Sequence, residues 1–146
     1  MINDNLALTG ALTIEVNNVV VQKAENLVVT AGKNWVADRM NNANTVMTYM
    51  ALGTGTTAAA AGNTTLVTEL DRNALTSTTV LNNTIAYAAT WAAGDATGAI
   101  TEAGIFDAAS GGDMLARTVF SVVNKGASDS ITITWILMVK KGIFLI

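Results

Sequence analysis

The sequence predicts a mainly β protein, an antiparallel β-sandwich of jelly-roll-like form with one short helix at about residues 30–42. The stretch Gly98–Val139 carries most of this prediction, because three apolar-rich segments alternate there with turns at Ala108–Gly112 and Asn124–Asp129. In its last segment, every second position is apolar, namely Ile131, Ile133, Trp135, Leu137 and Val139, and Thr132 and Thr134 fall on the other face. Such alternation between clusters of Gly, Ser, Asn and Asp is typical of consecutive antiparallel strands. Short connections between neighbouring segments favour a sandwich.

The N-terminal region, about residues 1–29, contains a predicted hairpin. Apolar and polar residues alternate over Ala11–Val16, and Asn17–Asn18 suits a tight turn because Asn tolerates positive φ. Two short strand segments, Val19–Val21 and Leu27–Val29, follow this turn. The pattern leaves two possibilities open: the hairpin lies on the sheet, or it projects as an arm.

One helix is predicted over Thr30–Asn42. Thr30 suits the N-cap position, and Trp35, Val36 and Met40 form an apolar stripe. The stripe predicts that the helix packs across the sheet, with Trp35 filling the core. The other aromatic residues predicted for the core are Trp91, Phe106, Phe120 and Trp135.

The middle of the chain is predicted to alternate strands with a long loop. Val46–Leu52 is a strand, and Gly53–Gly62 is a loop of small residues. The start of this loop resembles a phosphate cradle, but no Gly-Lys-Ser/Thr follows it, so an extended connection is expected. One helical turn is predicted around Leu66–Leu70, and a hairpin is predicted from Thr76–Val80 and Thr84–Trp91.

The composition predicts one domain, residues 1–146, that functions in an assembly. Charged residues make up 13% of the chain, about half the usual share, while 51% of its residues are hydrophobic. A β-rich domain with a threonine-covered face is the alternative interpretation. The net charge of −3 comes without a stripe of Lys or Arg, so no nucleic-acid partner is expected.

The ends of the chain bear on its location. Met1–Asn5 has neither a basic start nor an apolar run, which predicts synthesis in the cytosol without a signal peptide. Lys140 and Lys141 interrupt the apolar C-terminal segment, so no membrane span is expected.

The sequence offers no convincing catalytic constellation. Cysteine and histidine are both absent, which removes disulfides, the usual nucleophile–base systems and the commonest metal ligand. Glu102 and Asp107 have opposite parity on one predicted strand, so they do not suit the paired carboxylates of a glycosidase. Asp107 and Asp113 flank a glycine turn and are interpreted as turn residues rather than cation ligands. We therefore predict no catalytic, cofactor-binding or metal-binding residue and no small-molecule substrate.

The densest charge cluster consists of Glu69, Asp71 and Arg72. We interpret it as solvated, or as part of an ion pair with Arg117 or Glu102, rather than as an acid–base dyad. This interpretation again favours a structural protein.

The chain ends in an apolar tail, residues 142–146. Burying four such side chains at an interface would contribute roughly 1.5–3 kcal/mol each before ordering costs. Two interpretations remain open: the tail docks into a partner subunit, or it tucks under its own sheet. The residues predicted to contact other subunits or a scaffold are Leu6, Leu12, Ile14, Ile143, Phe144, Leu145 and Ile146.

Two segments, Ala51–Arg72 and Ile100–Trp135, resemble virion proteins of tailed bacteriophages. The similar proteins are head decoration (cement) proteins and tail-fibre or tail-collar modules, and the resemblance extends over roughly Leu27–Trp135. It implies a non-enzymatic β-rich subunit, commonly trimeric, bound to a capsid or tail scaffold. The chain departs from the pattern at Ala59–Ala60, where proline is common, and in the apolar tail after Trp135.

The resemblance therefore leads to a head decoration protein as the first expectation. Such a protein would form a homo-oligomer, expected to be a trimer, and clamp the major capsid protein on the outer surface of the expanded head. It would be made in the host cytoplasm and would need no cofactor. The alternative is a tail-fibre, tail-collar or baseplate module. A glycan hydrolase is the weakest hypothesis, since it would have to work with carboxylates alone.

Overall fold

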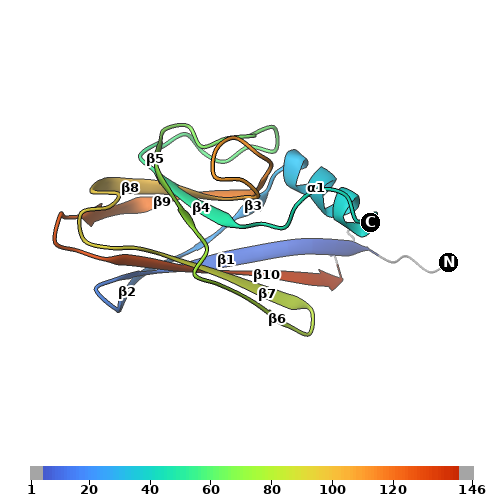
Figure 1. The fold of residues 1–146 in the computed structure, drawn as a ribbon, viewed down its shortest axis with the longest axis horizontal. Coiled ribbons are helices and arrows are strands. Elements are labelled where there is room, and N and C mark those ends of the chain that lie inside the picture. Colours follow the sequence, from blue (N-terminus) through green and yellow to red (C-terminus); the bar gives the residue numbers. More distant parts are fainter. Residues whose placement is uncertain (1–4, 142–146) are drawn as a thin grey trace, which may run out of the picture.

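The computed structural model, which describes residues 5–141, contains two five-stranded antiparallel sheets and one helix. The sheets face each other as the two layers of a sandwich (Figure 1). This architecture confirms the predicted mainly β fold with a single short helix. The first sheet has the strand order β2-β1-β10-β7-β6, and the second has the order β3-β9-β8-β4-β5. The elements are β1 (Leu6–Val16), β2 (Val19–Glu25), β3 (Leu27–Val28), α1 (Thr30–Met40), β4 (Tyr49–Gly53), β5 (Glu69–Ala74), β6 (Ser77–Leu81), β7 (Thr84–Trp91), β8 (Gly98–Phe106), β9 (Met114–Lys125) and β10 (Ile131–Lys141).

The first sheet joins the two ends of the described chain. Strand β1 pairs with β10 along its whole length, from Leu6 opposite Lys141 to Val16 opposite Ile131. Strand β2 pairs with the second half of β1, so the N-terminal hairpin lies in the sheet and does not project as an arm. Asn17 and Asn18 both adopt positive φ, as the tight turn requires.

The main core lies between the sheets and contains most of the predicted aromatic residues. Trp91 and Trp135 are fully buried, and Phe120 lies in the same cluster. Phe106 is also buried, but it belongs to a second, smaller cluster on the other side of the second sheet. Trp35 is half-buried against the core, and its indole N–H donates a hydrogen bond of 2.8 Å to the carbonyl oxygen of Thr45.

The helix α1 differs from the prediction in two details. Thr30 is its first helical residue, and the N-cap is Val29, which makes no side-chain capping bond. Met40 is exposed, so the apolar stripe does not reach the last turn. The helix packs closely against β9, because Gly32 has no side chain to separate it from the backbone of Leu115.

The helical turn predicted around Leu66–Leu70 is wrong. These residues are not helical, and β5 begins at Glu69 and pairs with β4. The backbone N–H groups of Val67 and Thr68 donate hydrogen bonds to the carboxylate of Glu102, which a helical turn would direct elsewhere. A long-range contact therefore overrides the local apolar spacing.

Candidate functional site

The loop of residues 54–68 lies over the outer face of the second sheet. Beneath it is the second apolar cluster, to which the loop contributes Leu66. The other buried members of this cluster are Val29, Ala51, Phe106 and Met114. The second sheet is therefore covered on both faces, by the first sheet and by its own loop.

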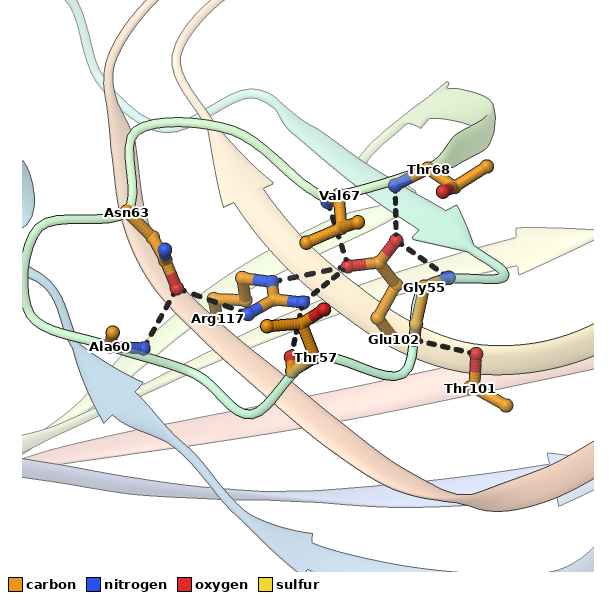
Figure 2. Close-up of polar contacts among 9 residues, drawn as sticks. All are labelled: Gly55, Thr57, Ala60, Asn63, Val67, Thr68, Thr101, Glu102 and Arg117. Carbon is orange, nitrogen blue, oxygen red and sulfur yellow. Dashed lines mark hydrogen bonds and ion pairs between the residues drawn. The ribbon is translucent and has the colours of Figure 1, made fainter.

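A buried ion pair holds this loop in place (Figure 2). Glu102 on β8 and Arg117 on β9 are both 0% exposed, and the Nη2 of Arg117 lies 2.8 Å from Oε2 of Glu102. The Nε of Arg117 donates a second bond, of 3.1 Å, to the same oxygen. Two donors on one guanidinium fix both the distance and the orientation of the pair.

Three backbone N–H groups of the loop complete the shell of the Glu102 carboxylate. Gly55 donates to Oε1 at 2.9 Å, Thr68 donates to Oε1 at 2.7 Å and Val67 donates to Oε2 at 3.0 Å. Gly55 cannot be replaced without movement, because a Cβ there would lie 2.5 Å from Oε1 of Glu102. The glycine loop that resembles a phosphate cradle thus binds an anion that belongs to the chain itself.

Arg117 uses its remaining donors on the other half of the loop. Its Nη2 donates to the carbonyl oxygen of Thr57 at 2.9 Å, and its Nη1 donates to the side-chain oxygen of Asn63 at 3.0 Å. The same Asn63 oxygen accepts a bond from the backbone N–H of Ala60. The two charged groups therefore fasten the loop at several points along its length.

The environment of Glu102 determines what its carboxyl group can do. Burial alone would raise the pKa of this carboxyl group. The hydrogen bonds from Thr68, Arg117, Val67 and Gly55 outweigh burial, and the pKa is lowered. A carboxylate that is fully enclosed and stabilised in its charged form has no open position for a substrate or a proton acceptor. We assign Glu102 and Arg117 a structural role in holding the loop.

The predicted charge cluster forms a separate contact. Arg72 pairs with Glu69, 2.7 Å apart, and not with Glu102, which is occupied by Arg117. Its Nη1 also donates to the carbonyl oxygens of Ala108 and Gly111, each at 2.9 Å, and its guanidinium lies 3.7 Å from the ring centroid of Phe106. Arg72 therefore fastens the turn between β8 and β9 to β5.

Asp107 and Asp113 lie in that same turn. Oδ1 of Asp107 accepts a bond of 2.7 Å from the backbone N–H of Asp113, and the two backbones are also bonded. This geometry confirms the interpretation of both residues as turn residues. Among residues 5–141, no three acidic side chains come together in a group that could hold a metal ion.

The structure separates the residues predicted to contact partners. Leu6 is 81% exposed at the end of β1, where a partner can reach it. Leu12 and Ile14 are buried in the main core, because the even positions of β1 face the second sheet. Their predicted role as contact residues is therefore wrong. Ile143, Phe144, Leu145 and Ile146 lie outside the described residues.

The outer face of the first sheet carries no charge over its central part. Three adjacent rows of residues cross β1, β10, β7 and β6, and all are small, hydroxylated or apolar. We call these residues the uncharged face: Thr9, Met138, Thr84, Leu81, Ala11, Ile136, Ala86, Thr79, Thr13, Thr134, Ala88 and Ser77. A threonine-covered face was predicted only as an alternative, since the sequence does not show which strands lie side by side.

Strand β6 forms one edge of that face. All five of its residues are exposed, and it contains neither a charged residue nor a bulge. Within the described chain, β6 pairs only with β7, so its outer backbone groups have no strand beside them. Edges of this kind are normally protected by charge, proline or a bulge, and an unprotected edge is suited to pairing with another strand.

Comparison of the chain with protein families, with curated proteins and with solved structures gave no match. In the described part of the chain, no helix is long and apolar enough to span a bilayer.

Proposed function

We propose that this chain is a non-enzymatic structural subunit of a bacteriophage virion, a head decoration protein that binds the outer surface of the expanded head. The uncharged face is the observation that carries this proposal. A subunit that works by adhesion needs a surface that can lose its water at low cost, and charged groups make that loss expensive. The uncharged face provides such a surface on four neighbouring strands.

The size of the face sets the scale of the contact. Four strands about 4.8 Å apart and three rows about 6.8 Å apart cover roughly 20 Å by 20 Å, from ordinary strand spacings. This is about half of the area, roughly 800 Å², that one partner contributes to a standard interface. A stable assembly therefore needs a second contact surface in addition to the uncharged face. The unprotected edge of β6 adjoins the face and is suited to this. Pairing of β6 with a neighbouring copy would supply a homo-oligomeric contact, in line with the trimer that the resemblance implies.

The resemblance to phage virion proteins also supports the proposal. The segments that carry it, Ala51–Arg72 and Ile100–Trp135, contain the loop and the strands that the ion pair of Glu102 and Arg117 joins. The residues that resemble virion proteins thus form one connected structural unit. Binding of the whole subunit to the expanded shell alone would stabilise that shell by mass action.

Co-sedimentation with undecorated expanded heads tests the proposal. The purified protein is expected to pellet with the heads, and Thr134→Glu on the uncharged face is expected to reduce binding at least tenfold. Thr97→Glu is the matched control, since Thr97 is exposed in the turn before β8, outside the uncharged face. Equal binding by the two variants would contradict the role of the face. Co-sedimentation with tails alone would replace the decoration protein by the tail-fibre or baseplate alternative.

A further inference from the structure

The open end of the sandwich contains an apolar cavity of about 590 Å³. It lies where α1 covers the ends of β1 and β10 (Figure 1). Aliphatic and aromatic side chains dominate its lining: Leu8, Trp35, Val36, Ile85, Leu137 and Val139. Small-molecule sites are commonly cavities of about 300–1,000 Å³ whose apolar lining carries a few polar groups that orient the ligand. The size and lining of this cavity therefore suit a small apolar molecule.

Tyr87 supplies a polar group inside the cavity. Its side chain contributes to the lining, and the residue is only 4% exposed. Its hydroxyl forms no hydrogen bond with any of residues 5–141, yet it is not one of the fully enclosed polar atoms without a partner in that part of the chain. The hydroxyl of this buried residue therefore opens into the cavity. Buried hydroxyl groups normally have a hydrogen-bond partner, so this one points to a ligand with a polar group of its own.

Lys33 supplies a positive charge on another side of the cavity. Among the described residues that line the cavity, it is the only charged one, and it is exposed in the first turn of α1. Neither ion pair of the described chain involves it. Lys33 also borders a groove beside β1, whereas Tyr87 lies on β7. Strand β10 separates β1 from β7, so these two strands are about 10 Å apart.

We infer that this cavity binds a medium-chain carboxylic acid that carries a hydroxyl group at its far end. The carboxylate pairs with the ammonium group of Lys33 at the exposed side, and the hydroxyl forms a hydrogen bond with Tyr87. The apolar chain between them covers the inner face of β10, where exposure rises from 1% at Leu137 to 44% at Val139. Covering this apolar surface favours binding. The acid is a bound ligand, no reaction of it is proposed, and the inference does not rest on the proposed virion role.

Isothermal titration of the full-length protein with decanoate and with its ω-hydroxy derivative tests the inference. Both acids are expected to bind at one site per chain, and the ω-hydroxy acid is expected to bind at least threefold more tightly. Lys33→Gln is expected to weaken the binding of both acids at least threefold. Lys23→Gln is the matched control, because it removes the same charge from β2, away from the cavity, and it is expected to leave both affinities unchanged. Tyr87→Phe is expected to abolish the preference for the ω-hydroxy acid.

Failure of both acids to bind the natural chain would overturn the inference. Equal weakening by Lys33→Gln and Lys23→Gln would overturn the position of the carboxylate, and an undiminished preference in Tyr87→Phe would overturn the position of the hydroxyl. Urea denaturation gives an independent measurement, since a ligand of the folded chain raises the midpoint as its concentration rises. Binding to phosphatidylglycerol vesicles in place of decanoate would assign the cavity to a membrane lipid and overturn the free acid. Purified protein alone is used throughout, so the outcome is separate from the sedimentation test.

Discussion

Replacing either member of the buried ion pair should detach the loop of residues 54–68 and destabilise the fold. Arg117→Met removes two bonds to Glu102 and leaves a carboxylate that is 0% exposed without a counter-charge. Removing one partner of a buried pair costs about 3–5 kcal/mol. The carboxylate keeps three backbone donors and can also take up a proton, so we expect the lower end, about 3 kcal/mol.

Glu102→Gln should be the more damaging change. A guanidinium cannot lose its proton, so Arg117 would remain charged and buried beside a neutral amide. The amide nitrogen of Gln would also face N–H donors of the loop in place of an acceptor. We expect the free energy of unfolding to fall by about 4–5 kcal/mol, at the upper end for a broken buried pair.

Urea denaturation with linear extrapolation measures these losses. Hydrogen exchange adds the local information, because the N–H groups of Gly55, Val67 and Thr68 should exchange faster while those of β10 change less. The double variant Glu102→Gln/Arg117→Met should lose at least 1 kcal/mol less than the sum of the single losses, since the residues are in direct contact. Losses below 1 kcal/mol in both single variants, or simple additivity, would refute the assigned role of the pair.

The pH dependence gives a second test of the same contact. Folding lowers the pKa of Glu102, so the unfolded chain binds a proton at pH values where the folded chain does not. The contribution of this group to stability is therefore complete above the ordinary Glu pKa of 4.5 and is lost as pH falls through the lowered value. The Glu102→Gln variant should show a weaker loss of stability below pH 4.5 than the natural chain. If the free energy of unfolding fell equally with pH in the two proteins, the lowered pKa of Glu102 would be contradicted.

Three further predictions follow from contacts around the loop and the core. Gly55→Ala should cost about 1–3 kcal/mol, as overpacking does, while Gly62→Ala, which meets no atom within 4 Å, should change stability by less than about 0.5 kcal/mol in urea denaturation. Burial raises the pKa of Tyr87 to about 12 from its ordinary 10.0, so stability should be lost as pH rises from 10.0 towards 12. Tyr87→Phe should remove the loss of stability that Tyr87 causes at alkaline pH. Identical dependence of stability on pH in the two proteins above pH 10.0 would contradict the raised pKa of Tyr87. Arg72→Met should increase proteolysis of the turn between β8 and β9, where the guanidinium holds two carbonyl oxygens; unchanged cleavage would contradict this role.

The strands could be predicted from the sequence because their signals are local. The alternation that ends at Val139 indicates which side of β10 is buried, and Asn17–Asn18 indicates a turn. Both signals are independent of residues elsewhere in the chain. The order of the strands could not be predicted in the same way. Strand β10 pairs with β1, more than a hundred residues earlier, and no local pattern specifies that partner. The status of Leu12 and Ile14 as core residues depends on that pairing.

The ion pair was missed for a related reason. Glu102 and Arg117 lie on neighbouring strands of one hairpin, which a register counted from the turn could have revealed. Their contacts with Gly55 and Thr57 cross 47 and 60 residues, and these depend on the path of the loop. The helical turn predicted at Leu66–Leu70 was wrong for the same reason. Local apolar spacing contains no information about hydrogen bonds to the distant carboxylate of Glu102.

The two sheets of the sandwich differ in a way that bears on how the subunit would assemble. The second sheet is enclosed, with a loop fixed on its outer face by charges that no solvent reaches. The first sheet has an outer face whose central part carries no charge, and it has an unprotected edge at β6. The ion pair that fixes the loop is itself buried, so it does not compete with a partner for water or counter-ions. On the proposed function, the first sheet therefore faces the capsid or a neighbouring copy, and the loop of residues 54–68 faces away from that contact.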